Sequence, residues 1–183
     1  LYKDTRRYED SEKMYLSAME IRRRLAAANP QVYEPDLAMT QYNLGCLYSD
    51  TQRYEDSEKM YLSAMEIRRR LAVANPQVYE PDLADTQYNL GCLYYNIQRY
   101  EDSEEMYLSA LEVYQRLTAV NPQVYEPYLV RACNNLSFLF LAQGNFEEAE
   151  RYAREGSKYD FTHHTIYTNL AASLLLQGRY AEA

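Results

Sequence analysis

The eight residues QYNLGCLY occur twice in this chain, at positions 41–48 and again at positions 87–94, and the repetition decides how the sequence folds. The identity extends well beyond the octapeptide, because residues 7–40 match residues 53–86 at all but two positions. A third and more divergent copy begins at Gln98. Self-similarity at a fixed period is typical of repeat architectures, so each unit is expected to be one supersecondary module.

The repeat length changes along the chain. The first units are 46 residues apart, whereas Asn135 is followed by its equivalent Asn169 after only 34 residues. We interpret the sequence as a fragment of one repeat domain, because it begins within an inner helix at Leu1 and stops within an outer helix at Ala183. The expected organisation is a single domain over residues 1–183, with a partial repeat 1–34, repeats 35–80, 81–126 and 127–161, and a partial repeat 162–183.

Two helices are predicted in each unit. The pattern EPDLA places Pro35, Pro81 and Pro127 where a first helical turn tolerates a missing N–H group, and NPQVY is interpreted as the end of the preceding helix. We expect inner helices at about 35–50 and 81–96 and outer helices at about 53–75 and 99–121.

Helical periodicity then separates core positions from solvent positions. The inner helix directs Leu37, Gln41, Leu44 and Tyr48 to one face, and Gly45 is expected to let another backbone come close. A matching stripe on the outer helix comprises Tyr54, Ser57, Tyr61, Ala64, Ile67 and Leu71. One hairpin covers these faces only in part, so stacking of neighbouring hairpins is expected to complete the core.

Composition narrows the class of protein. Five glycines and six prolines in 183 residues favour a helical chain over a loop-rich or disordered one. A net charge of −8 argues against binding to nucleic acid or to anionic membranes, and no apolar run is long enough to cross a bilayer. Three cysteines, an odd number, favour free thiols and hence a cytoplasmic location.

The pattern NLGCLY, followed by QRYEDSE and then MYLSA, resembles the tetratricopeptide repeat. Residues 135–160 fit the 34-residue form of this repeat, and the 46-residue copies are similar to the long repeats of kinesin light chains. The resemblance implies an all-α fold, a right-handed α-solenoid of antiparallel helical hairpins. The sequence departs from the family pattern at Gln52 and Gln98, which stand where a turn glycine is common.

The inner-helix face opposite the core is poor in charge, unlike an ordinary solvated face, and we interpret it as a recognition surface. The resemblance implies that this surface lines a concave peptide-binding groove. Its candidate residues are Met39, Tyr42, Asn43, Cys46, Asp85, Tyr88, Asn89, Cys92, Tyr95, Asn96, Arg131, Asn134, Asn135, Phe138 and Asn169. Within this set the tyrosines are amphipathic anchors of the kind that binding surfaces favour.

Asparagine recurs at one place in every copy, at residues 43, 89, 135 and 169. Two interpretations remain open for this ladder of carboxamides. In related repeats such a ladder holds the backbone of an extended peptide, and a buried amide that needs a partner can equally tie neighbouring helices together. The two roles are compatible.

The predicted function is a scaffold that binds an extended peptide or a short helix of a partner protein. Only Arg131 is basic on the predicted groove, so a clamp for a C-terminal carboxylate is not expected, and a neutral or mixed peptide fits better. The alternative function is a peptide-responsive regulatory or sensory module within a larger signalling protein. A further option is self-association through the apolar C-terminal end, which includes Leu175 and Leu176.

No enzymatic activity, metal site or cofactor is predicted. The sequence contains no phosphate loop, nucleophile elbow or zinc-ligand spacing, and its only histidines are the adjacent His163 and His164. The arginine triplets at 22–24 and 68–70 are interpreted as solvated surface, because they alternate between helix faces and lie near glutamates.

Overall fold

The structure is a computed structural model of the chain that describes residues 2–159, 164–180 and 182. These residues form α-helices and no strand, which confirms the all-α prediction. The helices are α1 (Tyr2–Ala28), α2 (Pro30–Asp50), α3 (Tyr54–Ala74), α4 (Pro76–Asn96), α5 (Tyr100–Val120), α6 (Pro122–Gln143), α7 (Phe146–Ser157) and α8 (His164–Leu176). The chain divides into two compact units, unit 1 (Leu1–Leu93) and unit 2 (Tyr94–Ala183), with the boundary inside α4.

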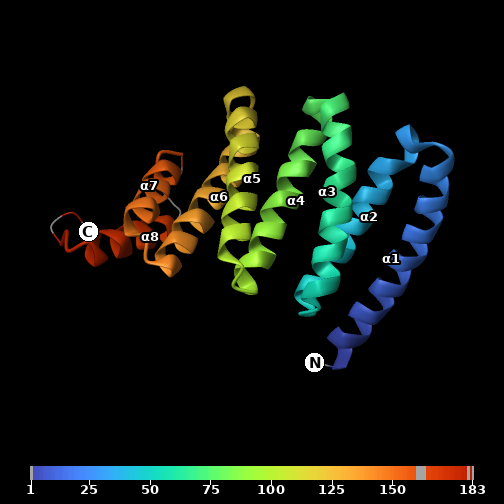
Figure 1. Cartoon of the computed structure of the whole chain (residues 1–183), viewed down its shortest axis with the longest axis horizontal. Coiled ribbons are helices and arrows are strands. Elements are labelled where there is room, and N and C mark those ends of the chain that lie inside the picture. Colours follow the sequence, from blue (N-terminus) through green and yellow to red (C-terminus); the bar gives the residue numbers. More distant parts are fainter. Residues whose placement is uncertain (1, 160–163, 181, 183) are drawn as a thin grey trace. The chain divides into compact units, whose positions relative to one another are not determined.

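Helices that follow each other in the sequence pack against each other within each unit (Figure 1). In unit 1, α1 packs on α2 and α2 packs on α3. In unit 2, α5 packs on α6, α6 on α7 and α7 on α8, while α8 also contacts α6. This nearest-neighbour packing is the stacking of hairpins that a solenoid requires, with α2, α4, α6 and α8 as inner helices.

The inner helices begin earlier than the proline pattern predicts. Asn29 stands outside the helix, and its carbonyl accepts hydrogen bonds from the N–H groups of Val32 and Tyr33 at 3.3 and 3.2 Å. Pro30 therefore occupies the first turn, where a missing N–H group has no cost, and Pro35 lies inside the helix. The preceding helices do end at NPQVY, with Asn75 and Asn121 as the C-caps of α3 and α5, but the rest of the same pattern begins the next helix, at Pro76 in α4 and at Pro122 in α6.

The extra length of the long repeats is thus helical. A single residue, Asn75, separates α3 from α4, and Asn121 separates α5 from α6 in the same way. The outer helices α3 and α5 have 21 residues each, whereas α7 in the 34-residue repeat has 12. The residues expected to lie between the outer helix 53–75 and the inner helix 81–96 are therefore part of α4 and not a loop.

The N-terminal segment also differs from the expectation. Tyr2–Ala28 is one continuous helix, so the expected turn from an inner to an outer helix does not form there, and Leu1 itself lies outside the described residues. In the following copy that turn places Gln52 in the left-handed region, with φ of 61°. A left-handed conformation costs a non-glycine residue about 1–2 kcal/mol, and the continuous helix avoids this cost at Arg6, the equivalent position.

The turns between inner and outer helices all use a left-handed residue. Gln98 has φ of 63°, and the glycines at the equivalent places, Gly144 and Gly178, have φ of 76° and 75°. The family's preference for glycine at this turn therefore has a conformational cause, and the long repeats accept a strained glutamine instead.

The core of unit 1 is formed as the periodicity predicts. Leu44 and Ala64 are fully buried, and Leu37, Gln41, Tyr48, Ser57, Tyr61 and Ile67 are also buried. Tyr54 and Leu71 are half-buried. The tyrosines at positions 48 and 61 are thus packing residues.

Gly45 meets a side chain rather than another backbone. A Cβ atom added at Gly45 would lie 2.6 Å from Cδ1 of Tyr61, so the glycine makes room for the tyrosine ring. The Ser57 hydroxyl donates a hydrogen bond of 2.7 Å to the Gly45 carbonyl. The ring and the hydroxyl together seat α3 on α2.

Candidate functional site

The residues predicted to line a groove differ widely in exposure. Met39, Asn96, Arg131 and Phe138 are exposed. Most of the others are half-buried, namely Tyr42, Asn43, Cys46, Asp85, Asn89, Cys92, Tyr95, Asn134 and Asn135. Tyr88 and Asn169 are buried, with 7% and 9% of their surface exposed. Tyr42 and Tyr88 thus lie in different environments although they occupy equivalent positions.

In unit 1 the predicted residues of α2 and α4 form one hydrogen-bonded network. The Tyr42 hydroxyl donates to Oδ2 of Asp85 at 2.6 Å. Asn89 donates from Nδ2 to the Tyr42 hydroxyl at 2.7 Å and to the Asp85 carbonyl at 3.0 Å. The structure therefore brings Tyr42, Asp85 and Asn89 together, and the two amide hydrogens of Asn89 are engaged within the chain.

The buried side chain of Arg68 on α3 also contacts this network, through the Tyr42 ring. Its guanidinium lies 4.6 Å from the centre of the Tyr42 ring and donates from Nη1 to the Asp82 carbonyl at 2.9 Å and to Oγ1 of Thr86 at 2.6 Å. Only 3% of Arg68 is exposed, so the prediction that the triplet at 68–70 is solvated is wrong for this residue. Position 68 lies one turn after Ala64 on α3 and continues the buried stripe of Tyr61 and Ala64. The helical spacing of these positions could therefore have identified Arg68 as a buried residue.

Burial sets the protonation of the groups around Tyr42. Burial, and then the hydrogen bond to Asp85, raise the pKa of Tyr42 far above its usual value, so its hydroxyl remains a donor. Burial also raises the pKa of the Cys46 thiol, although the hydrogen bond from the Tyr61 hydroxyl (3.3 Å to Sγ) acts in the opposite direction. A protonated thiol is a poor nucleophile, so Cys46 serves as small lining.

The asparagine ladder ties helices together wherever its bonds are described. Asn89 on α4 reaches Tyr42 on α2, and Asn135 on α6 donates to the Tyr107 hydroxyl on α5 at 3.2 Å. Asn169 on α8 donates to Oδ1 of Asn134 on α6 at 3.0 Å. Of the two interpretations of the ladder, the helix-tying one is observed at these positions. Asn43 differs, because no hydrogen bond of its side chain to a described residue is seen.

Unit 2 presents an aromatic cluster on the same kind of face. The Tyr95 ring lies 5.5 Å from Phe138 and 5.7 Å from Tyr100, centre to centre, in tilted geometries that aromatic pairs favour. Half of the Phe138 surface is exposed. Phe138 occupies the position that Cys46 and Cys92 have in the other copies, so this anchor is particular to α6.

A hollow of about 370 Å³ lies between α1 and α2 in unit 1. Its lining is Arg7, Tyr8, Ser11, Tyr15, Asn43, Cys46, Leu47 and Asp50, all from these two helices. Two of the predicted groove residues, Asn43 and Cys46, are therefore part of a concave surface together with residues of α1 that the sequence had not singled out.

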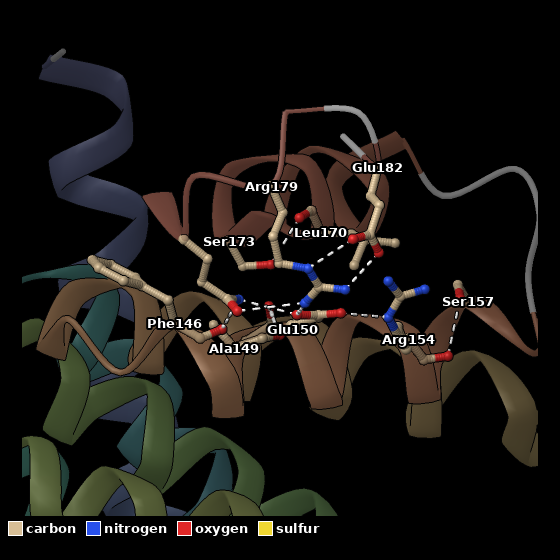
Figure 2. A network of polar contacts seen from close by, with 11 residues as sticks. Phe146, Ala149, Glu150, Arg154, Ser157, Leu170, Ser173, Arg179 and Glu182 are labelled. Atoms are coloured by element: carbon tan, nitrogen blue, oxygen red, sulfur yellow. Dashed lines mark hydrogen bonds and ion pairs between the residues drawn. The ribbon is translucent and has the colours of Figure 1, made fainter. Parts of the chain in front are cut away.

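A second polar network joins α7 to the segment after α8 (Figure 2). The Glu150 carboxylate accepts from Arg154 (2.7 Å) on one oxygen and from Arg179 (2.6 Å) and Gln177 (3.0 Å) on the other. Burial raises the pKa of Glu150, but these bonds and the arginine charges outweigh burial and leave it below its usual value. In unit 1, Arg53 and Glu12 occupy the positions equivalent to Arg179 and Glu150, and they form the same ion pair at 2.7 Å. The network therefore serves repeat stacking.

The sequence matches family profiles described as tetratricopeptide repeat over residues 36–116 and again over residues 129–156, together more than half of the chain. The chain belongs to the tetratricopeptide repeat family. A comparison with curated protein sequences gives no match.

Solved tetratricopeptide repeat structures share the fold. BtubC (BKLC) from P. vanneervenii superimposes with a TM-score of 0.68 at 17% identity, over 96% of this chain and 86% of that protein. A Podosopora anserina protein named as a kinesin light chain candidate, with nearly identical TPR-like repeats, gives 0.65 at 15% identity over 98% and 86%. A second structure of that protein, with a single substitution, gives the same values. At these identities the likeness concerns the fold alone.

Tetratricopeptide repeats are protein–protein interaction modules and are typically not enzymes. Within the described ranges no group of histidine, cysteine, aspartate and glutamate residues has the arrangement of a metal site. His163 lies outside those ranges. In the same part of the chain no helix is long and apolar enough to cross a bilayer.

Proposed function

We propose that this tetratricopeptide repeat chain binds an extended peptide or a short helix of a partner protein along the outward faces of its inner helices. The single observation that carries the proposal is Phe138, a half-exposed aromatic side chain held in place by Tyr95. Large side chains with few rotors that stand exposed in a defined position are typical energetic anchors of interfaces.

The contrast between inner and outer helices supports the same conclusion. The outer helices carry ion pairs on their solvent faces, such as Glu66 with Arg70 and Glu112 with Arg116, each at 3.0 Å. The outward faces of the inner helices instead carry Met39, Phe138 and amides. This face does carry Arg131 and Asp85, but a face so poor in charge that is not buried fits contact with a partner better than contact with water alone.

The contacts also restrict how a peptide would be held. The amide hydrogens of Asn89 already bond Tyr42 and Asp85, so Asn89 offers only its Oδ1 atom, which accepts from a peptide N–H group. In unit 2, Phe138 and Tyr95 offer an aromatic surface to an apolar side chain. We expect a peptide with an aliphatic or aromatic anchor and no requirement for a terminal carboxylate.

A peptide-library screen followed by one matched pair of variants tests the proposal. Phe138→Ala is expected to weaken selected peptides by about tenfold or more, because truncated hot-spot anchors cost about 2 kcal/mol or more and about 1.4 kcal/mol is tenfold in affinity. Val120→Ala removes an 85% exposed side chain at the end of α5 and should leave binding unchanged. Selected peptides that bind both variants alike, or a screen that selects none, would contradict the proposal.

A further inference from the structure

A stripe of side chains on the outward face of α6 has the spacing of a coiled-coil seam. The exposed large apolar side chains of this helix are Val124, Tyr128 and Phe138, with 48%, 39% and 50% of their surface exposed. They belong to a series of residues separated by four, three, four, three and four positions, which is the a/d spacing of a heptad and places them on one helix face. The series, called the α6 stripe below, comprises Val124, Tyr128, Arg131, Asn135, Phe138 and Ala142.

The two aromatic members of the α6 stripe are particular to this repeat. In both α2 and α4 the position equivalent to Tyr128 carries an aspartate, and the position equivalent to Phe138 carries a cysteine. The corresponding stripes of those helices therefore lack large aromatic side chains at these two places. Two exposed aromatic side chains on one face of a single helix indicate a contact surface, because such side chains are typical anchors of interfaces.

The α6 stripe is bordered by other elements of unit 2. The Tyr95 ring near the end of α4 lies 5.5 Å from the Phe138 ring, centre to centre. Asn169 on α8 donates to Oδ1 of Asn134 at 3.0 Å, beside the middle of the stripe. A segment that binds the stripe would thus lie along α6 and touch Tyr95 and α8 at its edges.

A helix suits the α6 stripe better than an extended chain. Apart from the Tyr128 hydroxyl, the polar members of the stripe are Arg131 and Asn135, which stand at its middle. An extended chain laid along α6 would place many backbone N–H and C=O groups against apolar side chains. A helix satisfies these groups within itself, and side chains at the same spacing can enter the spaces between the members of the stripe.

Arg131 defines the register of such a helix. Its guanidinium lies 5.3 Å from the centre of the Tyr128 ring, and its side chain is exposed. A polar residue within an otherwise apolar seam is a known determinant of register in coiled coils. A carboxylate on the incoming helix would complement the charge of Arg131 as the two helices come together.

We propose that the α6 stripe binds an amphipathic α-helix of a partner protein, packed along α6 as in a coiled coil; this inference rests on the proposed function and names the partner segment. The helix carries apolar side chains at positions i, i+4, i+14 and i+18, which face the apolar ends of the stripe. A glutamate at i+7 or i+11 faces Arg131. The intervals are the same in both directions, so the pattern serves a parallel or an antiparallel helix, and its length of about 27 Å matches that of the stripe.

A separate helix fits this place better than a second copy of the chain. In a second copy, α6 is packed between Tyr95 and α8 in the same way, so it is not available as a single helix that can lie between these borders. The net charge of −8 adds repulsion between two copies.

The test is isothermal titration calorimetry of the whole chain with a synthetic, acetylated and amidated peptide of 21 residues. The peptide has leucine at positions 2, 6, 16 and 20, glutamate at 9 and 13, and alanine, lysine and glutamine elsewhere. The two glutamates face Arg131 in either orientation and disfavour pairing of the peptide with itself. We expect saturable binding of one peptide per chain, and at least about tenfold weaker binding of a control peptide with the same composition but with its leucines spread around the helix.

Variants of the chain locate the site. Tyr128→Asp, which introduces the residue found in α4, should weaken the peptide about tenfold or more, and Val124→Lys should weaken it several-fold. Gln123→Ala alters an exposed neighbour outside the stripe and should have no effect. Circular dichroism checks that each variant remains folded.

A charge exchange tests the register without removing an aromatic side chain. Arg131→Glu should weaken the original peptide, and a peptide with lysine in place of both glutamates should bind this variant better than it binds the original chain. A loss of stability alone would not produce this exchange of preference.

Three results would overturn the proposal. The first is a peptide that does not bind, or binds no better than its control. The second is a set of library-selected peptides that lose affinity in Phe138→Ala but not in Tyr128→Asp, which would leave the proposed function standing and assign the site to another kind of segment. The third is a chain that dimerises by itself and is made monomeric by Tyr128→Asp, which would assign the stripe to a second copy.

Discussion

The hairpins α2–α3 in unit 1 and α6–α7 in unit 2 each have a hydroxyl-to-carbonyl hydrogen bond between their two helices, but the donor is on the outer helix in the first and on the inner helix in the second. In α2–α3 the inner helix supplies Gly45, and the outer helix supplies Tyr61 and the donating hydroxyl of Ser57. In α6–α7 the equivalent residues are Ser137, Ala153 and Ala149, and the Ser137 hydroxyl donates to the Ala149 carbonyl at 2.7 Å. The hydrogen bond has the same length, but the donor has moved to the other helix.

The joints between outer and following inner helices differ in a related way. Arg68, Asp82 and Thr86 form a polar clamp in unit 1, and their equivalents in unit 2 are Tyr114, Tyr128 and Ala132. The rings of Tyr114 and Tyr128 lie 5.6 Å apart, centre to centre. Residues that touch across this joint have thus changed together, so the contact between two helices, not the single residue, is the unit that tolerates change.

The largest expected effect comes from Tyr61→Ala, which should lower the free energy of unfolding by about 3–5 kcal/mol through the cavity it leaves. Gly45→Ala should destabilise the original chain, because the new Cβ would meet the Tyr61 ring. In the Tyr61→Ala background the same change should stabilise by up to about 1 kcal/mol, the difference in helix propensity. Urea unfolding followed by circular dichroism measures this cycle. A Gly45→Ala effect of the same sign in both backgrounds would show that the ring does not require the glycine.

Arg68→Met tests the polar clamp. Methionine fills the space of the arginine stem but leaves the Thr86 hydroxyl and the Asp82 carbonyl without the donor they share, at a cost of about 2–3 kcal/mol. Arg69→Met is the matched control, because Arg69 is exposed on the same turn. Thermal or urea unfolding of the two variants should differ clearly, and equal stabilities would mean that Arg68 contributes little.

Substitutions at the turns between inner and outer helices are expected to change stability less, and in opposite directions in the two units. Gln52→Gly should stabilise the chain by about 1 kcal/mol, because glycine adopts φ of 61° without strain. Gly144→Gln, the reverse exchange in unit 2, should destabilise it by a similar amount. Gln31→Gly makes the same chemical change inside α2 and should cost about 1 kcal/mol through helix propensity. A stabilising Gln31→Gly, or a neutral Gln52→Gly, would remove backbone strain as the explanation.

The smallest effect concerns the arginine–glutamate pair that both units retain. Because the pKa of Glu150 is lowered in the folded chain, its contribution to stability is present above the unfolded value of about 4.3. That contribution is lost as the pH falls through the folded pKa. The stability difference between the original chain and Glu150→Gln should therefore shrink on acidification, and a difference that grows would contradict the sign of the shift.

Much of this arrangement follows from local sequence. The core positions Leu37, Leu44 and Tyr61 are set by helical periodicity, which depends only on spacing. Arg68 was misjudged because its partners lie 14 and 18 residues away, and charged residues are seldom buried unless such partners exist. The early starts of the inner helices were missed because two prolines compete for the first turn, and only the observed bonds to the Asn29 carbonyl decide between them.

The single-residue joints at Asn75 and Asn121 have a consequence for how the folded chain meets a protease. Each joint is closed by its neighbours: the Asn75 N–H group donates to the Leu71 carbonyl at 2.9 Å, and the Asn75 carbonyl accepts from Val78 and Tyr79. A protease cleft needs an extended stretch of several residues, which a joint of one residue does not supply. Limited digestion at these places would therefore report unwinding of the helix ends, and its rate would measure local opening of the array.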